Sequence, residues 1–180
     1  MSKVAITLRV MIANATPMKT LLILRHAKSS WDDPAMPDHD RPLTERGKKD
    51  AQRLGQFLQE HGLVPDLIVS STARRAGKTA KKVAKACGYG GEIEIDGRLY
   101  QAHFSQFIGV LREVAEEHAT VLVVGHNPGL EEFVLHLTGQ TEPMPTAALA
   151  EVSLDIDSWQ SLSSPPGGRL VRVWRPREQA

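Results

Sequence analysis

Short apolar segments alternate with longer segments of helical periodicity along this chain, and no other feature constrains its fold more strongly. The pattern predicts strands at residues 20–24, 66–70, 93–95, 120–124, 148–156 and 170–174, and helices at 44–61, 73–87, 105–118 and from Pro128 onward. Strands that alternate with helices form a mostly parallel sheet with helices on both faces. The sequence therefore predicts an α/β fold, a three-layer αβα sandwich with a mostly parallel central sheet.

The domain organisation follows from the length and from the unusual start of the chain. A length of 180 residues favours one domain. The segment before the first predicted strand contains cations but no Asp or Glu, and Met18 directly precedes that strand. We expect residues 1–18 to form a flexible N-terminal leader and residues 19–176 to form a single domain. A basic start that lacks acids is also typical of organelle-targeting segments, which is the alternative interpretation.

Charge and cysteine content argue against several functions. The chain carries 22 Lys and Arg against 21 Asp and Glu, whereas general nucleic-acid or membrane-surface binders are usually more basic. No apolar run approaches the roughly 20 residues that span a bilayer. The single cysteine, Cys87, can form neither an intramolecular disulfide nor a Cys-rich zinc site, and it suits a reducing cytoplasm. We predict a cytoplasmic protein with no nucleic-acid or membrane partner, and the oligomeric state stays open.

Polar side chains follow three of the predicted strands at the points where the strands end. Arg25 and His26 follow the first strand, Ser71 and then Arg75 follow the second, and His126 follows the fourth. Ligands of such sheets bind beyond the carboxyl ends of the strands. We therefore expect these side chains to converge at one edge of the sheet.

Two arginines and two histidines at one edge suit phosphoryl chemistry. Arginine binds phosphate oxygens through paired, charge-assisted hydrogen bonds, and a neutral imidazole can attack phosphorus. A helix capped by Asn127, with Pro128 in its first position, would add backbone N–H donors next to His126. Two arginines can neutralise the transferred group without a metal. We expect neither a metal nor a cofactor.

Five segments of the chain resemble the motifs of one family. They are residues 22–27 (LILRHA), 41–47 (RPLTERG), 70–79 (SSTARRAGKT), 99–100 (LY) and 124–128 (VGHNP). With these motifs the chain resembles the histidine phosphatase superfamily, the phosphoglycerate-mutase-like group, and within it the phosphohistidine phosphatase SixA branch. The segments occur in the family's order, and the resemblance covers about residues 19–175. Ala27 stands where the family more commonly has Gly.

The resemblance implies a role for each matching residue. His26 would attack phosphorus and become phosphohistidine, while Arg25 and Arg75 would bind the phosphoryl oxygens. His126 would complete the pocket as a donor to them. The family's Arg-Ala-x-x-Thr spacing selects Arg75 over its neighbour in the sequence. Arg41 is a further candidate for substrate binding from its loop, with a loop salt bridge as the alternative.

The absence of a carboxylate after the Leu-Tyr segment indicates the class of substrate. Many members of the superfamily place a general acid soon after the Leu-Tyr segment, but residues 100–112 contain no Asp or Glu. An alkoxide leaving group needs such a donor, whereas a phosphoramidate can leave as an already protonated imidazole. The chain is therefore expected to hydrolyse protein phosphohistidine. The alternatives are a small-molecule phosphomonoesterase, with an acid from the loop, and a non-catalytic phosphoprotein-binding module. The acids that the loop could supply are Asp32, Asp33, Asp38 and Asp40.

Four lysines recur at helical spacing after Arg75. They are Lys78, Lys81, Lys82 and Lys85. They form either an ordinary solvated helix face or a docking surface for an acidic phosphoprotein. The remaining histidines are expected to be structural or exposed, namely His39, His61, His103, His118 and His136.

Overall fold

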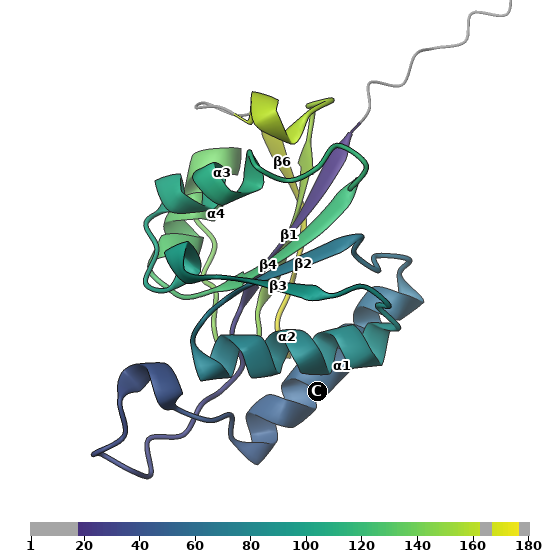
Figure 1. The fold of residues 1–180 in the computed structure, drawn as a ribbon. Helices are drawn as coiled ribbons and strands as arrows, with labels where there is room; N and C mark the ends of the chain where they lie inside the picture. The colour runs from purple at the N-terminus through teal and green to yellow at the C-terminus, as the bar shows by residue number, and fades with distance from the viewer. Residues whose placement is uncertain (1–17, 163–166, 177–180) are drawn as a thin grey trace, which may run out of the picture.

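A six-stranded sheet forms the centre of the computed structural model, which describes residues 18–162 and 167–176 (Figure 1). The strands are β1 (Lys19–Arg25), β2 (Leu67–Ser71), β3 (Ile93–Asp96), β4 (Thr120–Gly125), β5 (Leu149–Leu154) and β6 (Gly168–Trp174), in the order β3-β2-β4-β1-β5-β6. The pairs β3–β2, β2–β4 and β4–β1 are parallel, and β5 runs antiparallel to both of its neighbours. The prediction of a mostly parallel sheet is confirmed.

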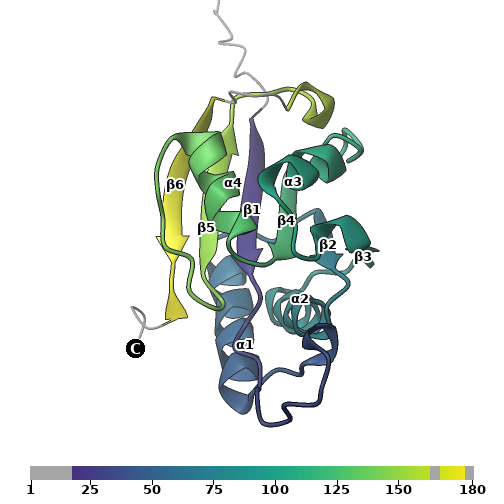
Figure 2. The same cartoon turned by 90° about the vertical axis from the view of Figure 1, so that its left-hand side faces the viewer.

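Helices cover both faces of this sheet (Figure 2). One face carries α1 (Glu45–Glu60) and α2 (Arg74–Cys87), and the other carries α3 (Phe104–Leu111) and α4 (Gly129–Thr138). Single 3-10 turns occur at η1 (Asp38–Asp40), η2 (Gly97–Leu99) and η3 (Trp159–Ser161). This is the predicted αβα sandwich.

The alternation of side chains along β1 explains why the sheet needs a helical layer on each face. Leu21 and Ile23 are buried among side chains of α3 and α4, while Leu22 and Leu24 are buried among those of α1 and α2. All four are fully buried. Successive strand residues point to opposite faces, so an apolar strand of this kind requires two hydrophobic cores.

Two details of the predicted helices are wrong. The helix predicted at 105–118 ends at Leu111, because the N–H groups of Glu113 and Val114 donate to carbonyls three residues earlier and tighten the chain. As a result Val114 is buried and Ala115 is exposed. Asn127 does not cap α4, because the N-cap position is Pro128 and the Asn127 side-chain oxygen accepts no hydrogen bond among the described residues; its amide nitrogen donates to Glu131 Oε1 and to the carbonyl of Met144.

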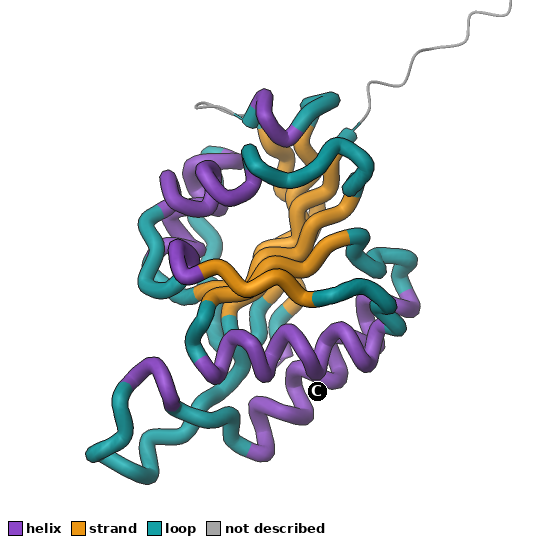
Figure 3. Tube along the Cα trace, in the orientation of Figure 1, coloured by secondary structure: helices purple, strands orange, loops and turns teal. Residues whose placement is uncertain are grey.

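The loop between β1 and α1 extends past the end of the sheet at which the parallel strands finish (Figure 3). It carries the turn η1, which contacts α2. Thr44 closes the loop by capping α1, since its side chain accepts a hydrogen bond from the N–H of Gly47. This loop thus covers the edge where the polar residues were expected to gather.

Part of the predicted organisation concerns residues outside the described ones. Apart from Met18, the expected flexible leader lies outside the described residues. Single-domain organisation stays a prediction. In the ranges 18–162 and 167–176, no helix combines the length and the apolar character that a membrane crossing requires.

Candidate active site

The parallel register of β1 and β4 brings the two predicted histidines together. Arg25 pairs with Gly125 in this register, and the N–H of His26 donates to the carbonyl of Gly125 over 3.1 Å. The next residue on each strand is therefore a histidine at the same level. The ring centroids of His26 and His126 lie 5.0 Å apart.

His26 is held in one orientation by its own backbone and by α2. Its Nδ1 lies 2.8 Å from the carbonyl oxygen of Ala27, and a carbonyl can only accept, so Nδ1 carries the ring proton. Its Nε2 accepts a hydrogen bond from Nε of Arg75 over 3.2 Å. Burial lowers the pKa of His26 to about 4, and the charges of Arg75 and Arg25 act in the same direction. At neutral pH, His26 thus presents an unprotonated Nε2 to the pocket.

His126 is oriented by Ser71, the last residue of β2. The Ser71 hydroxyl accepts from the N–H of Ala73 and lies 2.8 Å from His126 Nε2. Nη2 of Arg75 lies 3.4 Å from His126 Nδ1 and can only donate, so Nδ1 accepts from Arg75 and the ring proton sits on Nε2, which donates to Ser71. Burial lowers the pKa of His126 to about 3, assisted by the neighbouring His26 and Arg75. The ring is therefore neutral at neutral pH.

Asp38, at the start of η1, is the carboxylate that faces Arg75. Its Oδ2 accepts hydrogen bonds from Nη2 of Arg75 and from the Tyr100 hydroxyl, each over 2.9 Å, and its Oδ1 accepts from Nη1 of Arg41 over 2.8 Å. Partial burial on its own would raise the pKa of Asp38, but the hydrogen bonds from Tyr100, Arg75 and Arg41 outweigh it and lower the pKa to about 2. Asp38 is therefore ionised at neutral pH and cannot donate a proton.

The three other loop acids lie away from this pocket. Asp32 and Asp33 line a separate depression with Pro42 and Thr44. Asp40 is exposed. The loop thus brings only one of its four acids into the pocket, and that acid is the one already bound to arginine.

Arg25 and Arg41 differ in how many of their guanidinium donors already have a hydrogen-bond partner. Arg25 donates from Nη1 to the carbonyl of Met144 over 2.8 Å, while its buried Nε has no hydrogen-bond partner among the described residues. Arg41 is buried, and its guanidinium donates to Ser29, to Ser30 and to Asp38. Arg25 therefore retains a donor for a ligand, whereas Arg41 already fixes the loop.

These side chains line a cavity of about 330 Å³. The lining residues are Arg25, His26, Lys28, Ser29, Trp31, Asp38, Arg41, Arg75, Gln101, His126, Asn127 and Thr146. Four of them are Lys or Arg and one is an acid, so the lining is positively charged overall. A cavity of this kind can bind a phosphoryl group and expose it to the neutral Nε2 of His26.

All five predicted site residues line this cavity, and the sequence analysis missed the roles of two residues that orient them, Asp38 and Ser71. Asp38 was only one of four equivalent loop acids, and its place depends on a loop without periodicity. Ser71 was recognised as the end of a strand, but not as the partner of His126. The signal for Ser71 was its position at the same strand edge.

The chain resembles proteins of one superfamily in sequence and in structure. A model of the histidine phosphatase superfamily (branch 1) matches residues 21–128. An uncharacterized chloroplastic protein of Arabidopsis thaliana is 33% identical over 175 residues, covering 88% of this chain and 78% of that protein. A candidate phosphohistidine phosphatase SixA from Nakamurella multipartitia is 27% identical, with a TM-score of 0.79 over 88% of this chain and 96% of that chain. A protein histidine phosphatase SixA complexed with tungstate, 23% identical, shares the fold with a TM-score of 0.76 over 89% and 99% of the two chains.

Proposed function

Because the chain belongs to the histidine phosphatase superfamily, we propose that it hydrolyses phosphohistidine on proteins through a covalent intermediate on His26. The family match and the SixA-like fold support a phosphatase role. The observation that carries the mechanism is the neutral His26 ring, with its proton fixed on Nδ1 by the Ala27 carbonyl and its Nε2 next to Arg75.

The first step transfers the phosphoryl group from the substrate to the enzyme. His26 Nε2 attacks phosphorus, and an N–P bond forms on His26 while the N–P bond of the substrate breaks. The bonding electrons return to the substrate imidazole, which leaves as a neutral molecule when its other ring nitrogen carries a proton. Phosphorylation makes the His26 ring cationic, and the hydrogen bond from Nδ1 to Ala27 stabilises that state.

The second step releases phosphate. Water attacks phosphorus, the bond to His26 Nε2 breaks, and its electrons return to the ring nitrogen. The proton lost by the water ends on phosphate. The enzyme returns to the neutral histidine with which it began.

Arg25, Arg75 and His126 are proposed to bind the phosphoryl oxygens in both steps. Arg25 has a buried Nε without a described partner, and His126 can donate from Nδ1 to a phosphoryl oxygen in the tautomer in which Ser71 donates to Nε2. Arg75 donates to Asp38, whose carboxylate fixes the orientation of the guanidinium. Arg41 acts as a positioning residue through Asp38.

The ionised state of Asp38 supports phosphohistidine over a phosphate ester. The one loop acid in the cavity has a pKa lowered to about 2, so it supplies no proton to an alkoxide. A phosphoramidate requires no such donor. The proposal includes a cytoplasmic location and a phosphorylated protein as partner.

A side-by-side turnover assay without added metal tests this function. It compares a phosphohistidine-bearing protein with a panel of sugar and aryl phosphates, using wild type and His26→Ala. The proposal predicts fast release of phosphate from the phosphohistidine protein and none from the variant. A clear preference for an ester would indicate a phosphomonoesterase. Binding without turnover would indicate a phosphoprotein-binding module.

A further inference from the structure

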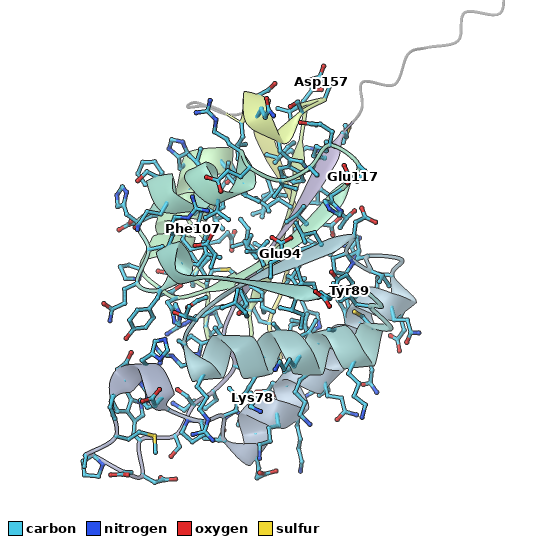
Figure 4. The ribbon with its side chains drawn as sticks, viewed as in Figure 1. Lys78, Tyr89, Glu94, Phe107, Glu117 and Asp157 are labelled. Atoms are coloured by element: carbon cyan, nitrogen blue, oxygen red, sulfur yellow. The ribbon has the colours of Figure 1, made fainter. Side chains whose placement is uncertain are left out.

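The outer face of α2 carries an unusual set of charges. Six cations and no acid lie on this helix, and the cations other than Arg75 are exposed. At about 100° per residue, Arg74, Lys78, Lys81, Lys82 and Lys85 fall within a sector about 100° wide. Figure 4 labels Lys78 on the side of α2 that faces away from the sheet. We call these five residues the α2 basic face.

The four lysines of the α2 basic face lack local partners. Among the described residues, no carboxylate lies within 4 Å of Lys78, Lys81, Lys82 or Lys85. The charge of Lys82 lowers the pKa of Glu45, but Glu45 forms its ion pair with Lys48. The charge of this face is therefore available to a partner.

This arrangement opposes the stability of the helix. Lys78 lies four residues before Lys82, and Lys81 lies four residues before Lys85, so like charges repel along the surface. Cations in the first turn also face the positive end of the helix dipole, and no side chain caps α2. An ordinary solvated face gains nothing from such a pattern, which instead suits recognition of a negative ligand.

The α2 basic face leads directly to the catalytic cavity. Arg75 lies in the first turn of α2 and lines the cavity, and Lys78 follows it by one turn. From Arg75 to Lys85 the helix rises about 15 Å, which an extended peptide covers with about five residues. A chain segment with its phosphorylated residue at His26 can thus place neighbouring acids along the lysines.

Building on the proposed phosphatase function, we propose that the α2 basic face docks an acidic segment of the phosphoprotein substrate next to the phosphorylated residue. A protein segment fits better than a nucleic acid. Six of the 22 Lys and Arg lie on α2, which leaves 16 cations against 21 acids in the rest of the chain. A long polyanion would be repelled by that remainder, whereas a short acidic segment needs only the local charge.

Four synthetic peptides test the proposal. Two carry phosphohistidine and two carry phosphoserine, and within each pair the flanking residues are either Asp and Glu or Asn and Gln. The KM for each peptide and for an aryl phosphate is measured with wild type, with Lys78→Glu/Lys82→Glu and with the control Arg112→Glu/Arg169→Glu. The control reverses two exposed cations outside α2.

The proposal predicts that wild type has a KM about fivefold lower for the acidic member of a pair, and that added salt reduces this preference. Lys78→Glu/Lys82→Glu should lose or reverse the preference while its turnover of the aryl phosphate stays unchanged. The control variant should retain the preference. Lys78→Gln/Lys82→Gln should give the same loss if the charge-reversed variant does not fold.

The results that overturn the docking proposal differ from those that overturn the function. Equal KM values for both flanks in wild type, or a preference that survives in both lysine variants, would overturn docking. Competition by a single-stranded RNA but not by an unphosphorylated acidic peptide would also overturn it and assign the face to nucleic acid. Turnover of phosphoserine but not phosphohistidine would overturn the proposed function, while the flanks would still test docking.

Discussion

Helices α2 and α4 both begin at the edge of the sheet that holds the cavity, but their charged residues are placed in opposite ways relative to the helix dipole. In α4, Glu131 and Glu132 occupy the first turn and His136 the last, which matches the helix dipole. In α2, the first turn contains no acid, Ala73 provides no side-chain cap, and Arg75 lies where the dipole disfavours a cation. Both helices end at a glycine in the left-handed conformation. The two helices therefore end alike and differ at their N-terminal turns, which are nearest the cavity.

This difference reflects the roles of the two helices, because α4 supports the loops behind the cavity and α2 contributes a residue to the cavity itself. Glu131 of α4 accepts hydrogen bonds from Asn127 and from the N–H of Met144, and so it fixes the loops behind the cavity. Arg75 of α2 contacts His26 and Asp38 inside it. Natural sequences break local stability rules mainly where function requires it. Substitution of Arg75 in α2 should therefore affect activity, and substitutions at the start of α4 should affect stability.

The largest expected effect is on activity, through the first turn of α2. Arg75→Ala should lower kcat/KM for an aryl phosphate about 10³-fold, because it removes a guanidinium from the transferred group. Its exposed neighbour provides the control, since Arg74→Ala removes a cation outside the cavity and should change kcat/KM less than about threefold. Steady-state kinetics measures both. Equal losses would contradict the separation between these neighbours.

Two glycines, one in each helix, allow the packing of α4 and α2 to be compared through the free energy of unfolding. A Cβ on Gly129 of α4 would meet the carbonyl oxygen of Ala102, whereas nothing lies within 4 Å of a Cβ on Gly77 of α2. Gly129→Ala should lower the free energy of unfolding by about 2 kcal/mol, and Gly77→Ala should raise it by about 0.5–1 kcal/mol. Urea denaturation measures both values. A stable Gly129→Ala protein would refute the close packing at the start of α4.

The two cavity histidines make stability depend on pH. Burial and the nearby arginines lower the pKa of His26 to about 4 and of His126 to about 3, against about 6.5 in the unfolded chain. The unfolded state binds more protons between these values, so the free energy of unfolding should fall as pH decreases from about 6.5 to about 4. Urea denaturation at several pH values tests this. His26→Gln/His126→Gln should flatten the dependence, and an unchanged slope would contradict it.

The smallest expected effect concerns the repulsion on α2. Lys78→Gln/Lys82→Gln should raise the melting temperature by about 1–3 °C, because it removes a like-charge pair. Added salt should shrink the difference between variant and wild type. Thermal denaturation at low and high salt measures it. A lower melting temperature in the variant would show that the lysines stabilise α2.

The sequence predicted the sheet and the meeting of its polar edge residues because both depend on local patterns. Apolar runs specify β1 and β4, and their parallel pairing necessarily places His26 beside His126. The bounds of α1 and α2 were also predictable, since Thr44 and Gly88 mark a start and an end.

The rest depended on contacts that no local pattern encodes. Asp38 was indistinguishable from the other loop acids until η1 folded against Arg75 and Tyr100. The helix predicted at 105–118 is too long, because Val114 rather than Ala115 is buried in the core next to α3. Tertiary packing decided both cases.

The most direct test of the central claim is to trap the intermediate. Enzyme and phosphohistidine protein are mixed, quenched within the first turnover in alkaline denaturant, and analysed by intact-mass and peptide mass spectrometry. The account predicts one added phosphoryl group on His26 of wild type and none on His26→Ala. Turnover without a phosphoryl group on the enzyme, or a phosphoryl group on a different residue, would contradict it.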